Sequence, residues 1–160
     1  MMIIEKANLS TAEKQELREL WNAEYPHRLA HPSITDFEKY LHGLEDQKHR
    51  LYLTDKNQIL GWYFDFIRDA ERWFAIILRS SVHGMGLGSQ MISQAKKENP
   101  CLNGWVIDKD DEVLANGQAY RSPLEFYQKN GFKVLKDQRL ELEHISAVKI
   151  VWEKSESESK

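Results

Sequence analysis

The sequence predicts a single α+β domain, and two patterns in it indicate this fold class. Apolar residues recur at helical spacing over residues 9–25 and 32–46, whereas the period changes to two over residues 49–78. In that second region three strand-like runs, "HRLYLTD", "QILGWYFDFIRD" and "ERWFAIIL", are separated by short turns, which predicts an antiparallel meander. A chain of 160 residues, 41% of them hydrophobic, has the size of one compact domain with a full core.

The amino-terminal part of the chain predicts one strand and two helices. "MIIEKA" indicates a short strand over residues 2–7. Residues 9–25 follow as a helix, with Ser10 or Thr11 as its N-cap and an apolar face formed by Leu17, Leu20 and Trp21. Residues 32–46 predict the second helix. In the middle strand of the meander, one face carries the aromatic side chains Trp62, Phe64 and Phe66.

The carboxy-terminal half predicts helix, strand, helix and two closing strands, over residues 88–99, 103–109, 122–132, 132–143 and 147–154. The second of these helices is short, but residues typical of helix starts and helix ends stand at both of its termini. We expect Ser122 as its N-cap, Pro123 at its first position, Glu125 completing a capping box and Gly131 ending it. The remaining residues, 155–160, predict a disordered acidic tail.

Composition excludes several classes of function. A net charge of −3 and an isoelectric point near 6.1 argue against binding to nucleic acid or to an anionic membrane. The start of the chain does not resemble a signal peptide, and no apolar run approaches the roughly 18 residues of a membrane span. A single cysteine, Cys101, suits a reducing compartment, so we expect a cytoplasmic protein. The six histidines are not partnered by cysteines, and no metal site is expected.

Three glycines, Gly84, Gly86 and Gly88, stand at alternate positions between an apolar run and a predicted helix. A glycine-rich turn that opens a helix can present backbone N–H groups to a phosphate or pyrophosphate. The alternative is a tight strand-to-helix turn without a ligand. A dinucleotide site is a remote alternative, because the G-x-G-x-x-G fingerprint lacks its third glycine and the glycines follow a meander.

These residues resemble the GNAT acyltransferase superfamily, whose acetyl-CoA turn is written R/Q-x-x-G-x-G/A. Gly86 and Gly88 match its two small positions, and His83 stands where Arg or Gln is usual. "LEFYQKNGF" resembles the second signature of the superfamily, a helix with a Tyr four residues before a Gly-Phe pair, here Tyr127, Gly131 and Phe132. The element order β-α-α-β-β-β-α-β-α-β-β also matches, so the resemblance covers residues 1–154 as a single acyl-CoA N-acyltransferase domain.

The resemblance implies a mostly antiparallel sheet of about six or seven strands, splayed near the cofactor, with helices on both faces. It also implies acetyl-CoA as cosubstrate, with Tyr127 protonating the departing thiolate after direct attack by an amine. The backbone around Ile77 and Leu78 would bind the pantetheine arm. The N–H groups of the turn would bind the pyrophosphate, a role shared by His83, Gly84, Met85, Gly86, Leu87, Gly88 and Ser89.

Two departures from the family pattern concern the same site. His83 in its neutral form would offset less of the negative charge of the phosphates than an arginine would. An Asn often precedes the Tyr of this superfamily by seven residues, but Asn116 precedes Tyr127 by eleven, so Tyr120 and Arg121 are expected in the site instead. The acceptor pocket would be formed by the segment around Trp21 and Tyr25 together with these two residues.

The identity of the acceptor amine and of the general base stays open at this stage. Asp65, Glu71 and Glu24 are the candidate bases, and an amine that arrives neutral or loses its proton through water is the alternative. A homodimer is left open too. The alternative function is a catalytically idle CoA-binding, sensing or interaction domain with the same fold.

Overall fold

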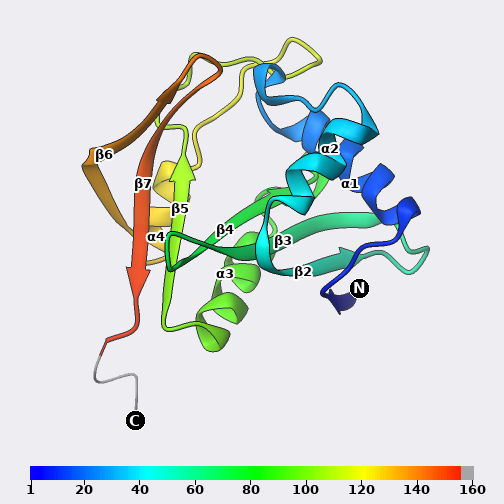
Figure 1. Ribbon diagram of the computed structural model, residues 1–160, viewed down its shortest axis with the longest axis horizontal. Coiled ribbons are helices and arrows are strands. Elements are labelled where there is room, and N and C mark those ends of the chain that lie inside the picture. Colours follow the sequence, from blue (N-terminus) through cyan, green and yellow to red (C-terminus); the bar gives the residue numbers. More distant parts are fainter. Residues whose placement is uncertain (156–160) are drawn as a thin grey trace.

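The computed structural model describes residues 1–155 and has one seven-stranded sheet with helices on both faces (Figure 1). The strands are β1 (Met2–Lys6), β2 (Glu45–Leu53), β3 (Ile59–Arg68), β4 (Glu71–Leu78), β5 (Cys101–Val106), β6 (Lys133–Leu142) and β7 (Ile145–Glu153). The helices are α1 (Thr11–Glu24), α2 (Ile34–His42), α3 (Leu87–Glu98) and α4 (Leu124–Lys129). The predicted fold class and element order are confirmed; the predicted tail, apart from Ser155, lies outside the described residues.

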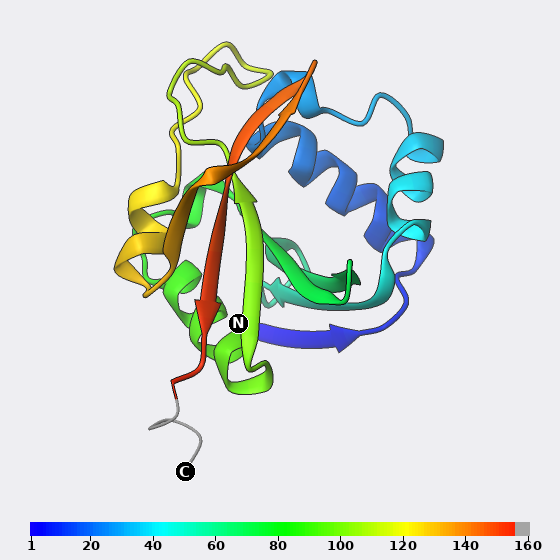
Figure 2. The same ribbon diagram turned by 60° about the vertical axis from the view of Figure 1, so that its left-hand side comes forward.

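The sheet divides into two arms where β4 meets β5. Its strand order is β1-β2-β3-β4-β5-β7-β6, and every neighbouring pair is antiparallel except β4 and β5. That parallel pair is joined at one register position, Trp73 with Asn103, and the strands diverge beyond it (Figures 1 and 2). The buried Asn103 amide reinforces the junction by donating to the Arg72 carbonyl at 3.1 Å. Within residues 1–155, no strand pairs with the β5-facing edge of β4 from Phe74 to Leu78.

Helices α1 and α2 cover one face of the β1–β4 arm, and their sequences explain how they begin. Ser10 and Glu13 form a reciprocal capping box at the start of α1, and Ser33 accepts the Asp36 N–H at the start of α2. Each such cap stabilises a helix by about 1 kcal/mol. Leu17 and Leu20 of α1 are fully buried against the sheet, on the face that carries the predicted aromatic row Trp62, Phe64 and Phe66.

Helices α3 and α4 cover the opposite face and share a second core with Phe74 and Phe132. The predicted end of α4 is confirmed, because Gly131 adopts a left-handed φ of 86°. Its predicted start was wrong by one residue: Pro123 is the N-cap, and no side-chain cap forms there. The Ser122 backbone N–H donates to Asp110 of the preceding loop at 2.7 Å. The Ser122 hydroxyl still accepts the Leu124 N–H at 3.2 Å.

Candidate active site

A cavity of about 1040 Å³ lies where the two arms of the sheet separate. Its lining comes from segments far apart in the sequence: the α1–α2 connection, β4, the start of α3, β5, the 114–127 region and the β6–β7 hairpin. Large concave cavities of this size are the usual places for substrates and cofactors. Most of the predicted site residues line it, namely Trp21, Tyr25, Ile77, Leu78, His83, Gly84, Gly86, Leu87, Gly88, Ser89, Tyr120, Arg121 and Tyr127.

The turn at one end of the cavity presents backbone donors. Gly84 and Gly86 have φ values of 77° and 81°, a left-handed conformation in which glycine has no steric cost. Gly86 is the N-cap of α3, and no side chain caps this helix. Within residues 1–155, no acceptor lies against the N–H groups of Leu87, Gly88 and Ser89. The positive end of the α3 dipole and these free donors suit an anion.

The third glycine has a different role from the other two. A Cβ added to Gly88 would lie 2.9 Å from Cζ of Phe126 and 3.4 Å from Cδ1 of Leu78. Gly88 therefore lets α4 pack closely against the start of α3. Met85, also expected in the binding turn, has a side chain that is 73% exposed and does not line the cavity.

His83 is already engaged within the turn. Its backbone N–H donates to the Ser80 carbonyl at 3.1 Å, and its Nε2 lies 3.0 Å from the Leu78 carbonyl oxygen. The His83 backbone N–H is thus not free for a phosphate, which leaves residues 84–89 as the donors of this turn. The ring instead fixes the end of β4 against the turn, at a carbonyl that the sequence predicted as a contact for the pantetheine arm.

Tyr127 lies on α4. It belongs to the second core and also lines the cavity. Phe74, Phe126 and Phe132 surround the ring, with centroid distances of 5.7, 5.1 and 5.6 Å. Within the described chain the Tyr127 hydroxyl makes no hydrogen bond, which is unusual for a buried tyrosine. Burial raises the pKa of Tyr127, and neighbouring Tyr120 adds to the effect, so the phenol stays protonated at neutral pH.

The opposite end of the cavity is aromatic. The Trp21 indole N–H donates to the Leu29 carbonyl at 2.8 Å, which ties α1 to the following turn, and Tyr25 packs edge-on against Trp21. Burial raises the pKa of Tyr25 well above its ordinary value and that of Tyr120 to about 12. Both are neutral hydroxyls in the physiological range.

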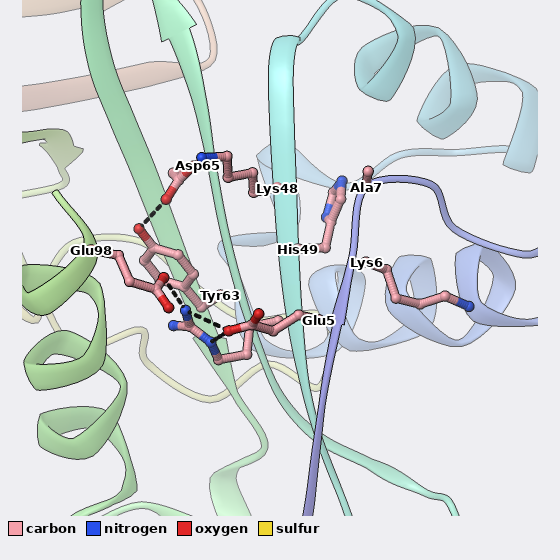
Figure 3. Close-up of a pocket in the computed structure, with 9 residues that line it drawn as sticks. Glu5, Lys6, Ala7, Lys48, His49, Tyr63, Asp65 and Glu98 are labelled. Carbon is pink, nitrogen blue, oxygen red and sulfur yellow. Dashed lines mark hydrogen bonds and ion pairs between the residues drawn. The ribbon is translucent and has the colours of Figure 1, made fainter.

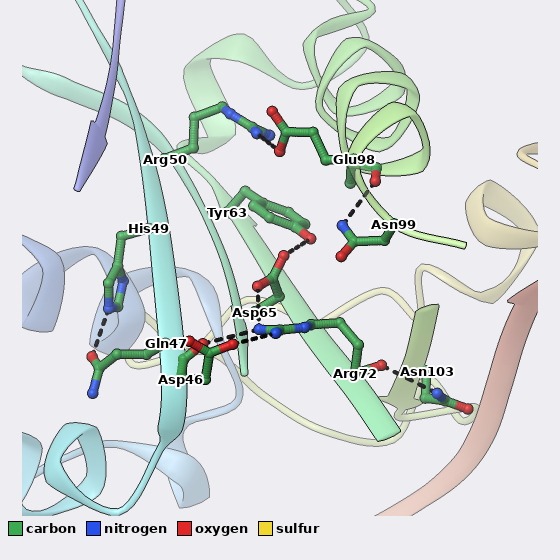
Figure 4. Close-up of polar contacts among 11 residues, drawn as sticks. Asp46, Gln47, His49, Arg50, Tyr63, Asp65, Arg72, Glu98, Asn99 and Asn103 are labelled. Atoms are coloured by element: carbon green, nitrogen blue, oxygen red, sulfur yellow. Dashed lines mark hydrogen bonds and ion pairs between the residues drawn. The ribbon is translucent and has the colours of Figure 1, made fainter. Parts of the chain in front are cut away.

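Two of the three candidate bases do not line this cavity. Asp65 is buried in a polar network, where it accepts from the Tyr63 hydroxyl and from Arg72 at 2.9 Å (Figure 4). It faces a separate cavity of about 220 Å³ beside Glu5 and Glu98 (Figure 3). Glu71 instead interacts with Lys149 at 3.4 Å. Only Glu24 lines the large cavity, and one of its oxygens accepts the Ser80 N–H at 2.8 Å.

Several residues that line the aromatic end were not among the predicted site residues. The most informative are His31, Tyr40, Phe66, Arg68 and Trp105. The β6–β7 hairpin also contributes Leu140, Leu142, His144 and Ile145. His31 follows shortly after the predicted acceptor segment around Trp21 and Tyr25, but nothing in the local sequence pattern distinguishes this histidine from its neighbours.

Asn116 lies outside the site. Its side-chain oxygen accepts the Gln118 N–H at 2.9 Å, and it does not line the large cavity. Tyr120 and Arg121 line it instead. His27 and His31 are four residues apart, but within residues 1–155 no group of three or more His, Cys, Asp or Glu side chains could hold a metal ion. No helix in the described part of the chain is long and apolar enough to cross a membrane.

Comparison with known proteins identifies the fold. Neither a family model nor a curated protein sequence matches this chain. Among solved structures, an aminoglycoside 6'-N-acetyltransferase complexed with coenzyme A is 15% identical, with a TM-score of 0.68 over 96% of this chain and 97% of that chain. A GNAT-family acetyltransferase from Staphylococcus aureus Mu50 is 13% identical, with a TM-score of 0.66 over 96% of this chain and 100% of that chain. The protein has the GNAT acyltransferase fold.

A spermidine N-acetyltransferase from Vibrio cholerae shares the GNAT fold at 12% identity, with a TM-score of 0.64 over 96% of this chain and 95% of that chain. The match therefore extends over nearly the whole of each chain. The acceptors named for these proteins, an aminoglycoside and spermidine, differ greatly in structure. The GNAT fold consequently does not specify an acceptor. The choice of acceptor depends on the side chains that line this cavity.

Proposed function

We propose that this protein is an acetyl-CoA-dependent N-acetyltransferase that transfers the acetyl group directly to a primary amine. The observation that supports this most strongly is one continuous cavity that joins the uncapped start of α3, the open edge of β4 and Tyr127. A structural neighbour of the same fold is complexed with coenzyme A, which agrees with acetyl-CoA as the cosubstrate.

The residues present fit acetyl-CoA in three ways. The free N–H groups at the start of α3 suit its pyrophosphate. The β5-facing edge of β4, near Ile77 and Leu78, leaves main-chain groups for the peptide-like pantetheine arm, in the manner of an added strand. The Leu78 carbonyl is not one of these free groups, because it already lies 3.0 Å from His83 Nε2. A volume of about 1040 Å³ is large enough for that arm together with a small acceptor. When bound, acetyl-CoA supplies the activated acetyl group.

The proposed role of Tyr127 is to donate its phenolic proton to the departing sulfur. Its raised pKa keeps this proton in place until the thiolate forms. The lining of the cavity contains no cysteine, so direct attack by the amine is favoured over a covalent acyl-enzyme. Catalysis then rests mainly on positioning of the two substrates, on backbone N–H groups that polarise the carbonyl, and on the proton transfers.

A screen of acceptors tests this function. We expect purified protein mixed with acetyl-CoA to release free thiol when a suitable primary amine is added, in proportion to the acceptor consumed. The panel includes aromatic amines, amino acids, aminoglycosides and polyamines, and mass spectrometry checks each product for one added acetyl group. Tight binding of acetyl-CoA without acceptor-dependent thiol release across the panel would instead favour the idle CoA-binding domain.

A further inference from the structure

His31 is held in an unusual way at the aromatic end of the cavity. Its backbone is fixed by three hydrogen bonds: the His31 N–H donates to Asn22 Oδ1 at 2.8 Å, and its carbonyl accepts from Arg18 Nε at 2.9 Å and Asn22 Nδ2 at 3.0 Å. Two side chains of α1 thus position this one residue. The His31 ring, by contrast, makes no hydrogen bond within residues 1–155.

The ring is oriented by aromatic neighbours. Centroid distances to Trp21, Phe37 and Tyr40 are 4.6, 5.1 and 5.3 Å. Nε2 is enclosed and has no hydrogen-bond partner. Nδ1 is not among the enclosed atoms, so it is the ring nitrogen that can reach a ligand in the cavity, and it can accept a proton only in the tautomer that carries its hydrogen on Nε2.

The charged groups around His31 favour its neutral form. Burial lowers the pKa of His31; Asp36 on α2 opposes this effect, and Arg18 on α1 adds to it. Tyr40, whose ring centroid lies 5.3 Å from that of His31, has its own pKa raised by burial to about 12, so it is uncharged. The imidazole is thus an available base at neutral pH rather than a cation.

We propose that His31 is the general base, accepting a proton from the acceptor amine in the cavity. The assignment rests on the proposed acetyl transfer. Glu24 is the other candidate that lines the cavity, but one of its oxygens already accepts the Ser80 N–H, whereas His31 has a fixed ring with no hydrogen bond to the protein. Asp65 and Glu71 do not line the cavity.

Two residues, His31 and Tyr127, account for all the proton transfers of the proposed reaction. An acceptor ammonium gives one N–H proton to His31 Nδ1 and keeps the electron pair, which then forms the C–N bond as the C–S bond breaks. Tyr127 gives its proton to the departing sulfur, and the second proton of the attacking nitrogen restores the Tyr127 hydroxyl. His31 finally releases its proton to water. The net products are an amide, a free thiol and one proton.

Replacement of His31 by Gln tests the assignment, because glutamine keeps a polar side chain but cannot accept the proton. We expect kcat/KM to fall about 100-fold, with acetyl-CoA affinity and melting temperature nearly unchanged. The wild-type kcat/KM should decrease as pH falls below the lowered pKa of His31, and this acidic limb should disappear in the variant. Added imidazole should restore rate to His31→Ala in proportion to its concentration. His42→Gln, an exposed histidine at the end of α2 and outside the cavity, is the matched control and should keep the limb.

A second readout does not depend on turnover. Nitrogen NMR of the wild-type imidazole should show the Nε2-protonated tautomer at neutral pH and a pKa below 6.5. A cationic His31 ring or an Nδ1-protonated ring at neutral pH would overturn the assignment, as would a His31→Gln enzyme with full rate and an unchanged limb. If the wild type releases no thiol with any amine, the proposed function itself fails and the role of His31 falls with it. Full activity of His31→Gln removes only the role of His31.

Discussion

Replacing Gly86 by Trp should abolish acetyl-CoA binding, with a loss of affinity of at least about 100-fold, while the domain stays folded. Gly86 is the N-cap of α3, and a large side chain there would occupy the space in front of the free N–H groups. Each hydrogen bond to a charged phosphate is worth about 1.5–3 kcal/mol, so losing two of them accounts for such a change. Calorimetric titration with acetyl-CoA measures the effect.

The domain should survive this substitution because, among the described residues other than Met85 and Leu87 beside it, no atom lies within 4 Å of a Cβ placed at Gly86. The left-handed φ of 81° costs a tryptophan about 1–2 kcal/mol. Gly117 gives a matched control: its φ is 84°, its Cβ would also meet nothing within 4 Å, and it does not line the cavity. Gly117→Trp should therefore bear the same strain and bind acetyl-CoA normally. Equal affinities of both variants and wild type would contradict the pyrophosphate assignment.

Replacing Tyr127 by Phe should lower kcat about 100-fold and leave acetyl-CoA affinity nearly unchanged, because a general acid acts mainly in the transition state. The hydroxyl makes no hydrogen bond within the described residues, so its removal should cost little stability. Because the raised pKa keeps Tyr127 protonated, this residue should add no limb to the pH profile in the neutral range. Steady-state kinetics with any acceptor found by the thiol assay measures kcat.

Tyr52→Phe is the matched control for this change. Tyr52 lies on β2, is buried in the same core as Tyr127 and does not line the cavity. It should keep the wild-type kcat. A Tyr127→Phe enzyme that is as active as Tyr52→Phe would contradict the general-acid role and show that Tyr127 is only a structural residue of the core.

Local pattern was sufficient to predict most of the fold. The helical spacing of Leu17, Leu20 and Trp21 reflects burial on one face, and the row from Trp62 to Phe66 reflects the two-residue period of a strand. These signals lie within single elements. The predicted start of α4 was wrong by one residue, at Ser122, whose backbone N–H binds Asp110 in the preceding loop.

The candidate site was predictable only in part. The turn and Tyr127 belong to short contiguous motifs, so their residues could be named in advance. The three glycines look alike in sequence, yet two supply left-handed backbone and Gly88 makes room for Phe126. His31 acquires its setting from Arg18, Asn22, Phe37 and Tyr40, on two helices. Such an arrangement follows from tertiary packing, which no local period encodes.

A crystal structure of the acetyl-CoA complex tests the central claim most directly. The account predicts the pyrophosphate at the start of α3, with its oxygens about 3 Å from backbone nitrogens of residues 84–89. It also predicts the pantetheine arm along β4 and the thioester sulfur beside the Tyr127 hydroxyl. Acetyl-CoA bound elsewhere on the protein, or with its pyrophosphate away from this turn, would contradict it.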